Sequence, residues 1–418
     1  MKRICSLICI ALVMLLIGCS STESTSNPKK DDSEQDKQKV QLSWSMWANT
    51  PEEKQAWENL ANKVTEEYPN IEVKVQTVGW ADYWTKLPTN FASNKEADII
   101  SVHYSRAQGF ASSFLPLDDF IKNDPNIKIE DFNEHILNSF KYKEQQVGLP
   151  YDFGPFVVYY NKDLFDKYQI PYPEAGWSWE EFVETARKLS QNQDKGFVVS
   201  SYIDHFIPFI FSNGGSHLDE NGNYDLTNPK FVEIIQRLSD IVVDGYAPPL
   251  VATDNPLWDQ EQWLRGNIGM FVNGPWAMGG LSNNANFDFD IVPIPEGKDG
   301  SVTAIVGSGF SISKGTKFPE EAFKALTVLT SEDSLIELAE LGRAFPARKS
   351  GHDIYYETVP ESFKDVLTYA SSNAKGYLTT PTWQQGYDLI LRGLVPIFNG
   401  QISVEEGLKD LQQQLENL

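Results

Sequence analysis

The first clear folding signal in the chain is a strand, a helix and a second strand in succession, and it restricts the fold class strongly. Residues 40–47, VQLSWSMW, are dominated by apolar and aromatic side chains without a breaker, which is typical of a buried strand. A helix is predicted next, with Thr50 as its N-cap and Glu53 completing a capping box. Residues 71–78, IEVKVQTV, alternate as a second strand. Two strands joined by a helix predict a parallel pair with a right-handed crossover, and therefore an α/β fold.

The same alternation of strands and helices continues along most of the chain. Further strands are expected at residues 97–104, 156–161, 267–274, 289–295 and 302–313. Further helices are expected at residues 81–94, 178–190, 319–330, 332–341, 383–398 and 403–416. Hydrophobic residues make up 41% of the sequence, which is enough for a sizeable core. Because about 400 residues exceed what one ordinary core supports, two α/β lobes are the economical assembly.

The N-terminus has the order of features of an export signal. Lys2 and Arg3 form a short basic start, and residues 4–17 are almost wholly apolar over a length that suits a signal peptide better than a membrane span. This run ends in Leu-Ile-Gly-Cys, which resembles the lipobox of bacterial lipoproteins. The resemblance implies that residues 1–18 are a signal peptide and that the Cys19 sulfur carries a lipid. An ordinary signal peptide with an incidental cysteine is the alternative.

Residues 19–38 are expected to form the lipidated N-terminus and a flexible tether, because large apolar side chains are missing from residues 20–38. A lipid and a tether would hold a folded domain at the extracytoplasmic face of the cell membrane without embedding it. Cys5 and Cys9 would leave with the signal peptide, so no disulfide is expected. The net charge of −23 makes nucleic acid a poor partner, and its simplest consequence is solubility.

Motifs of catalysis are missing from the sequence. It contains no nucleophile elbow, no Walker loop and no GxGxxG after a strand. The five histidines show no metal-ligand spacing, so neither a metal nor a cofactor is expected. Because carboxylates are plentiful, the sequence does not exclude a catalytic carboxylate pair of the kind that glycosidases use. Residues 219–228, DENGNYDLTN, lack the residue order of a calcium loop, and a hairpin turn on Asn221 and Gly222 is the favoured interpretation.

Aromatic residues gather where the predicted strands end, which is where open α/β sheets bind ligands. The residues concerned are Trp44, Trp47, Tyr104, Tyr151, Trp276 and Trp383. Packing in a core is the alternative for any one of them. Together they favour a ligand with flat apolar faces and many hydroxyl groups. A pyranose has both, because its C–H face can lie on an aromatic ring while its rim needs hydrogen-bond donors and acceptors.

Several longer stretches, taken in order, resemble one known family. They are GLPYDFGPFVVYYNKDLFDKYQIPYPEAGWSWEEF, RGNIGMFVNGPW, GRAFPARKS, PTWQQGYDLI and NGQISVEEGLKDLQQQL. The chain is similar over nearly its whole length to the extracellular solute-binding family that includes maltose-binding protein, the capture component of carbohydrate ABC importers. The resemblance implies a periplasmic-binding-protein-like fold, in which two α/β lobes are joined by hinge strands and hold the ligand in the cleft between them.

The resemblance also implies lobe boundaries and ligand contacts. The first lobe would take residues 40–148 and about 305–345, and the second lobe residues 149–304 and about 346–418. The aromatic residues of GPW and PTW are stacking positions in the family and fall on Trp276 and Trp383. Tyr104 and Ser105 stand where a maltodextrin binder would carry Asp, which argues against maltose. The candidate ligand-binding residues are Trp47, Asn49, Tyr83, Tyr104, Ser105, Asp152, Trp276, Ser308, Arg343 and Trp383.

The function implied is that of a lipid-anchored protein that captures a sugar, expected to be an oligosaccharide, and delivers it to the permease subunits of an ABC importer. The protein would act as a monomer, without catalysis, through closure of its lobes around the ligand. Asp152 and Arg343 are the polar candidates at the hinge and the cleft edge, and an ion pair without a ligand role is their alternative. A surface-anchored glycoside hydrolase and an adhesin are the competing functions.

Overall fold

The computed structural model describes residues 39–418 apart from residues 126, 254, 378 and 381. The predicted signal peptide, the lipidated Cys19 and the tether lie outside the described residues. Within the described part, no helix combines the length and the apolar character needed to cross a membrane. Residues 39–418 form one compact unit, which contains two main sheets.

A six-stranded sheet is built around the first predicted strand. Strands β1 (Val40–Trp47) and β2 (Ile71–Val78) pair in parallel, which confirms the predicted parallel arrangement. Strand β3 (Ile99–His103) is parallel to β1 on its other side, and β11 (Thr303–Ile312) runs antiparallel to β3. Strand β11 also pairs with β6 (Leu149–Pro155) and with β12 (Ala374–Gly376).

The helices around this sheet are α1 (Pro51–Glu67), α2 (Trp80–Ala92), α3 (Tyr104–Phe110), α4 (Asp118–Asn123), α5 (Glu134–Asn138), α12 (Pro319–Leu329) and α13 (Glu332–Glu340). Four of them, α1, α2, α12 and α13, lie close to their predicted positions, whereas α3, α4 and α5 were not predicted. Thr50 caps α1 by accepting the Glu53 N–H at 3.2 Å. The Glu53 carboxylate accepts the N–H of Asn49 at 2.7 Å in place of the N–H of Thr50, so only one half of the predicted capping box is formed. The capping interaction therefore also fixes the loop that follows β1.

A four-stranded sheet has the order β10-β7-β9-β8. Its strands are β7 (Val157–Asn161), β8 (Lys195–Phe197), β9 (Ile268–Asn273) and β10 (Phe289–Val292). Its first helices are α6 (Lys162–Tyr168), α7 (Trp179–Leu189), α8 (Ile203–Ser212), α9 (Pro229–Val243), α10 (Trp258–Trp263) and α11 (Met278–Asn284). The C-terminal helices are α14 (His352–Glu357), α15 (Glu361–Ser372), α16 (Trp383–Phe398) and α17 (Val404–Leu415). The predicted capping box between Ser178 and Glu181 is present at the start of α7.

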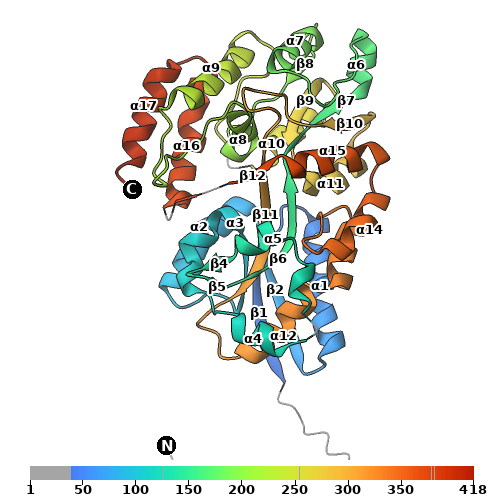
Figure 1. The fold of residues 1–418 in the computed structure, drawn as a ribbon, viewed down its shortest axis with the longest axis vertical. Coiled ribbons are helices and arrows are strands. Elements are labelled where there is room, and N and C mark those ends of the chain that lie inside the picture. Colours follow the sequence, from blue (N-terminus) through green and yellow to red (C-terminus); the bar gives the residue numbers. More distant parts are fainter. Residues whose placement is uncertain (1–38, 126, 254, 378, 381) are drawn as a thin grey trace, which may run out of the picture. The chain divides into compact units, whose positions relative to one another are not determined.

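The two sheets are connected by strands that run from one to the other (Figure 1). Only Phe156 separates β6 of the larger sheet from β7 of the smaller one. A later segment runs beside β6, since the Phe153 N–H donates to the Phe345 carbonyl and the Ala347 N–H donates to the Tyr151 carbonyl. The architecture is thus the two-lobed α/β fold that the sequence predicts.

Two strands lie on the far side of the boundaries expected from the sequence. Strands β6 and β12 fall within the ranges expected for the second lobe, but both pair with β11 in the six-stranded sheet. Their position follows from strand pairing over long sequence distances. The exact division of the chain into lobes stays a prediction.

The acidic loop after α8 forms the predicted hairpin turn. Leu218 and Tyr224 make an antiparallel bridge, and Gly222 has the left-handed φ of 81° that favours glycine in such a turn. The Asp219 carboxylate accepts the N–H groups of Asn221 and Asn223 at 2.8 Å each. These hydrogen bonds lower the pKa of Asp219 and give its carboxylate a role within the turn.

Candidate ligand-binding site

A cavity of about 740 Å³ is lined by residues from elements of both sheets. Six of the ten residues expected to bind ligand line it: Trp47, Asn49, Asp152, Trp276, Ser308 and Arg343. Its volume falls in the range of about 300–1,000 Å³ that is usual for small-molecule sites. The topology therefore brings together side chains from the end of β1, from β6 and β11, and from the turn after β9.

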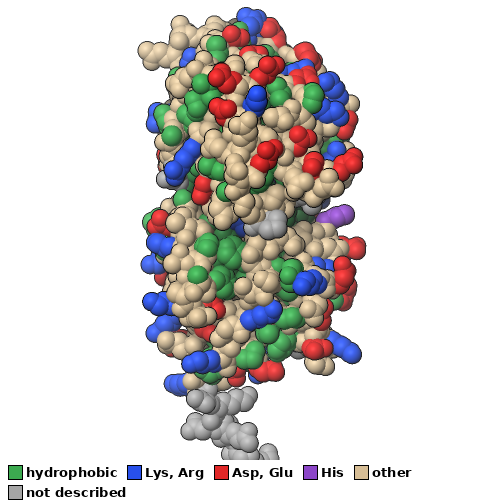
Figure 2. Space-filling view, turned by 90° about the vertical axis from the view of Figure 1, so that its left-hand side faces the viewer, with side chains coloured by type: hydrophobic (Ala, Val, Ile, Leu, Met, Phe, Trp, Pro, Cys, Tyr) green, Lys and Arg blue, Asp and Glu red, His purple; other side chains and the backbone are tan. Residues whose placement is uncertain are grey.

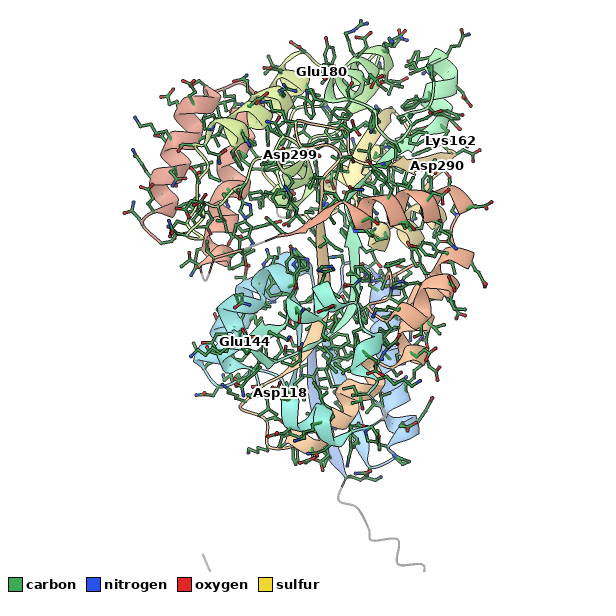
Figure 3. All side chains as sticks on the ribbon, viewed as in Figure 1. Asp118, Glu144, Lys162, Glu180, Asp290 and Asp299 are labelled. Atoms are coloured by element: carbon green, nitrogen blue, oxygen red, sulfur yellow. The ribbon has the colours of Figure 1, made fainter. Side chains whose placement is uncertain are left out.

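Many charged side chains of the protein lie outside the cavity wall. The labelled residues Asp118, Glu144, Lys162, Glu180, Asp290 and Asp299 are distributed over both halves in Figure 3, and none of them belongs to the described cavity wall. Figure 2 shows acidic and basic side chains interspersed over one face of the protein. This distribution fits the interpretation of the net charge as a source of solubility.

Trp276 lines the cavity, and its position is fixed by the turn in which it lies. It lies in the 3₁₀ turn Pro275–Ala277 after β9, is half-buried, and meets Phe156 edge-on with ring centroids 5.2 Å apart. A Cβ atom on Gly274 would lie 2.1 Å from the Trp276 ring, and one on Gly154 would lie 2.3 Å from Pro275. Glycine at both positions therefore gives the ring its place.

A second aromatic wall comes from the larger sheet. Trp47 ends β1, is 4% exposed, and packs edge-on against Trp80 with centroids 5.0 Å apart. Trp47 and Trp80 both line the cavity, whereas Tyr83, which also contacts Trp47, does not belong to the described wall. The Tyr83 hydroxyl instead donates to the Ser101 carbonyl at 2.6 Å, inside the core.

Asp152 and Ser308 form the polar centre of the wall between the sheets. The pairing of β6 with β11 shifts register between Ser308 and Gly309, and the Ser308 N–H donates to the Asp152 carboxylate at 2.6 Å. Asp152 is buried, and burial raises its pKa to about 7 although the Arg343 charge opposes the shift. The carboxyl group is thus held in a site where it is costly to ionise.

Arg343 lies at the cavity edge with two described partners. Its Nε is 3.7 Å from the Glu53 carboxylate, and its guanidinium lies over the Trp57 ring at 5.2 Å from the centroid. Nε itself is buried without a hydrogen-bond partner among the described residues. The helix cap of α1 is therefore coupled to the cavity, because Glu53 both caps the helix start and faces Arg343.

Two acid-containing pairs that involve cavity-lining residues were not anticipated from the sequence. His205 Nδ1 and Asp259 Oδ2 are 2.5 Å apart, and the Tyr387 hydroxyl donates to Asp204 at 2.8 Å. Burial alone would lower the pKa of His205, but the charge and the hydrogen bond of Asp259 outweigh it and raise the pKa. Asp204, His205 and Tyr387 all line the cavity.

The sequence held only a weak signal for these pairs. Asp204 and His205 are adjacent polar residues, but they lie in the first turn of α8, a helix that was not predicted. Their partners lie 183 and 54 residues further along the chain. No local pattern indicates such partners, because only the packing of α8 against α10 and α16 brings them together.

The other predicted residues lie outside the described cavity wall. His103, the residue before Tyr104, lines the cavity, whereas Tyr104 and Ser105 turn away as the first residues of α3. Ser105 is fully buried and its hydroxyl lies 2.6 Å from His103 Nδ1. Burial and the nearby Arg106 charge lower the pKa of His103 to about 3, so it is neutral at ordinary pH.

Trp383 is packed inside the protein. It is 2% exposed and lies parallel to Tyr224, with ring centroids 6.0 Å apart, while His217 and Tyr377 meet it edge-on. Tyr387, one helical turn later on α16, reaches the cavity instead. The alternative of core packing therefore describes the position of Trp383.

Comparison with known proteins places this architecture in a family. A sequence model of the bacterial extracellular solute-binding protein family matches residues 47–335. A putative binding protein of Brucella abortus is 24% identical over 82% of this chain and 85% of its own length. The arabinooligosaccharide-binding protein of Halalkalibacterium halodurans is 24% identical over 52% of this chain and 50% of its own length.

A solved structure shares the fold. The ABC substrate-binding protein Lmo0181 from Listeria monocytogenes, in complex with cycloalternan, has a TM-score of 0.83 and 23% sequence identity, over 90% of this chain and 98% of that one. The family match extends over well more than half of the 418 residues and contains β3, β6, β9 and β11, which build the cavity. The protein belongs to the bacterial extracellular solute-binding protein family.

Proposed function

We propose that the protein captures a carbohydrate outside the cytoplasm and delivers it to an ABC importer. The observation that carries this proposal is the half-buried Trp276 ring beside polar groups in one cavity. An indole face suits the C–H face of a sugar, while Asp152, His205 and Asp204 can exchange hydrogen bonds with its hydroxyl groups. The ligand class is supported by the names of the relatives, which include an arabinooligosaccharide-binding protein and a protein bound to cycloalternan.

The proposed ligand is an oligosaccharide. Aromatic rings line two parts of the cavity, Trp47 and Trp80 on the side of β1 and Trp276 after β9. One pyranose face covers about one indole, so two separated ring positions suit at least two sugar units. The cavity volume of about 740 Å³ agrees with a ligand larger than one monosaccharide.

Four predicted residues are proposed as polar ligand contacts: Asn49, Asp152, Ser308 and Arg343. Arg343 supplies a permanent cation at the edge, and its buried Nε has no described hydrogen-bond partner. Asp204 and His205 join the set because both line the same cavity. His205 Nδ1 is held by Asp259, which fixes the ring and leaves Nε2 as the nitrogen for a ligand.

The proposed location follows from the N-terminus. Cleavage before Cys19 and lipidation of its sulfur would hold the protein at the extracytoplasmic face of the membrane, close to the importer. Replacing Cys19 by alanine should release the protein from the membrane fraction or block its processing. Normal cleavage with unchanged membrane retention would refute the lipid anchor while leaving the proposed ligand intact.

Isothermal titration calorimetry with a panel of neutral oligosaccharides, run beside a product assay, tests the main proposal. Binding without turnover is the expected result. Turnover would instead indicate a glycoside hydrolase, and the lack of any binding by a folded protein would refute carbohydrate capture. Trp276→Ala should weaken binding, whereas Tyr369→Ala, a change at an exposed ring outside the described cavity wall, serves as the matched control.

A further inference from the structure

Two glycines meet at the rim of the cavity through their main chains alone. The Gly279 N–H donates to the Gly342 carbonyl at 3.0 Å, and both residues line the cavity. Gly279 is the second residue of α11, which follows β9 of the four-stranded sheet. Gly342 follows α13, which packs against α12 beside the six-stranded sheet. The hydrogen bond therefore joins elements that belong to different sheets.

The contact leaves no room for a side chain at Gly279. A Cβ atom there would lie 2.6 Å from the Leu341 carbonyl oxygen and 2.9 Å from the Gly342 oxygen. Both atoms belong to the main chain, so they cannot move aside by changing a rotamer. The turn that presents them is fixed, because Gly342 has a left-handed φ of 61° and its N–H donates to the Ala339 carbonyl at the end of α13.

The next glycine is free of this constraint. A Cβ atom on Gly280 would lie 3.7 Å from Gln260 Nε2, an ordinary contact with a flexible side chain. Both glycines lie in the same helix, and neither has a positive φ. Alanine should therefore favour the helix equally at the two positions, and only position 279 should feel the opposing main chain.

We infer that the Gly279–Gly342 main-chain contact closes the rim of the cavity, and that these glycines are positioning residues for ligand capture. The inference rests on the proposed function. Arg343 directly follows Gly342 and lines the cavity. The contact between Gly279 and Gly342 therefore also holds the main chain that carries the Arg343 side chain at the cavity edge. Closure to this distance requires a residue without a side chain at position 279.

The test compares Gly279→Ala with Gly280→Ala in the full chain. Calorimetry with the sugar that binds the parent best should show affinity reduced about ten- to a hundred-fold in Gly279→Ala, the usual size of an overpacking effect. Gly280→Ala also adds a methyl group to the cavity wall, but it meets no main-chain atom there, so its affinity should fall much less; an equal fall in both variants would overturn the inference. Thermal unfolding should stay close to that of the parent in both variants. A Gly279→Ala variant with the parent's affinity would overturn the inference.

Amide hydrogen exchange supplies a readout that a defect in folding would not reproduce. In the parent and in Gly280→Ala, the sugar should slow exchange in residues 341–343, and in Gly279→Ala this protection should be lost. If no sugar binds the parent, the proposed function fails on its own. The Gly279–Gly342 contact is then tested in the ligand-free proteins. If residues 341–343 exchange at the same rate in Gly279→Ala and in Gly280→Ala, the inference about the contact is overturned.

Discussion

Replacing Asp152 by asparagine should stabilise the protein at pH 8 and should have about a third of that effect at pH 5. Asp152 is buried, and its pKa is raised from 3.8 to about 7 chiefly by burial. The folded chain therefore holds this proton more tightly than the unfolded chain does. Stability is lost as the pH rises from about 4 to about 7, because ionisation then favours the unfolded state, and the loss is complete above that range. Asparagine cannot ionise, so it removes the penalty.

The magnitude follows from the size of the shift. One pKa unit corresponds to about 1.4 kcal/mol, so a shift of about three units corresponds to about 4 kcal/mol. The entropy of unfolding of a unit of about 380 residues is about 0.8 kcal/mol/K, so the melting temperature should rise by about 5 °C at pH 8. The asparagine side-chain oxygen can still accept the Ser308 N–H, so the local hydrogen bond is kept.

Thermal and urea unfolding of the parent and the variant at pH 5 and pH 8 would measure this difference. Asp365→Asn, a change at an exposed position in α15, is the control and should unfold like the parent at both pH values. The opposite sign would refute the reasoning. If Asp152→Asn is less stable than the parent at pH 8, attraction between the carboxylate and Arg343 outweighs the cost of burial.

Three further predictions concern the packing of named residues. Trp276→Ala should weaken sugar binding by about ten- to a hundred-fold in calorimetry, because the sugar can no longer bury part of an indole ring. A lower melting temperature with unchanged affinity would contradict a ligand role. Trp383→Ala should cost about 3–5 kcal/mol of stability in urea unfolding, because the ring is 2% exposed, and an unchanged midpoint would show that the site collapses. Gly196→Ala should lower the melting temperature strongly, because a Cβ atom there would lie 2.0 Å from the Ala186 carbonyl oxygen in α7. A variant as stable as the parent would show that α7 can shift away from β8.

Much of the secondary structure could be read from the sequence because its signals are local. Strands β1 and β2 begin and end at their predicted residues, since alternation and the flanking turn residues lie within a few positions of each strand. The capping box of α7 was recognisable for the same reason, as its two partners are three residues apart. The turn that carries Trp276 was similarly visible as a glycine–proline–tryptophan sequence after a strand.

The candidate site could be predicted only in part. Trp383 was expected to contact the ligand from the family resemblance, whereas Tyr387, one turn later on α16, was not among the candidates. Only the packing of α16 decides that Trp383 lies against Tyr224 while Tyr387 reaches the cavity. The tertiary structure also decides which residue at the end of β3 faces the cavity. Because α3 begins at Tyr104, His103 lines the cavity and the predicted Tyr104 and Ser105 do not.

The sequence by itself thus determined the fold class, the opening β1-α1-β2 unit and the aromatic turn after β9. Periodicity, caps and turns are local interactions, and they leave their pattern within a few residues. The tertiary structure alone decided that β6 pairs with β11, that Asp259 holds His205, and that Gly279 meets Gly342. These contacts join residues 54 or more positions apart, and their geometry depends on how whole elements pack, which no short stretch of sequence encodes.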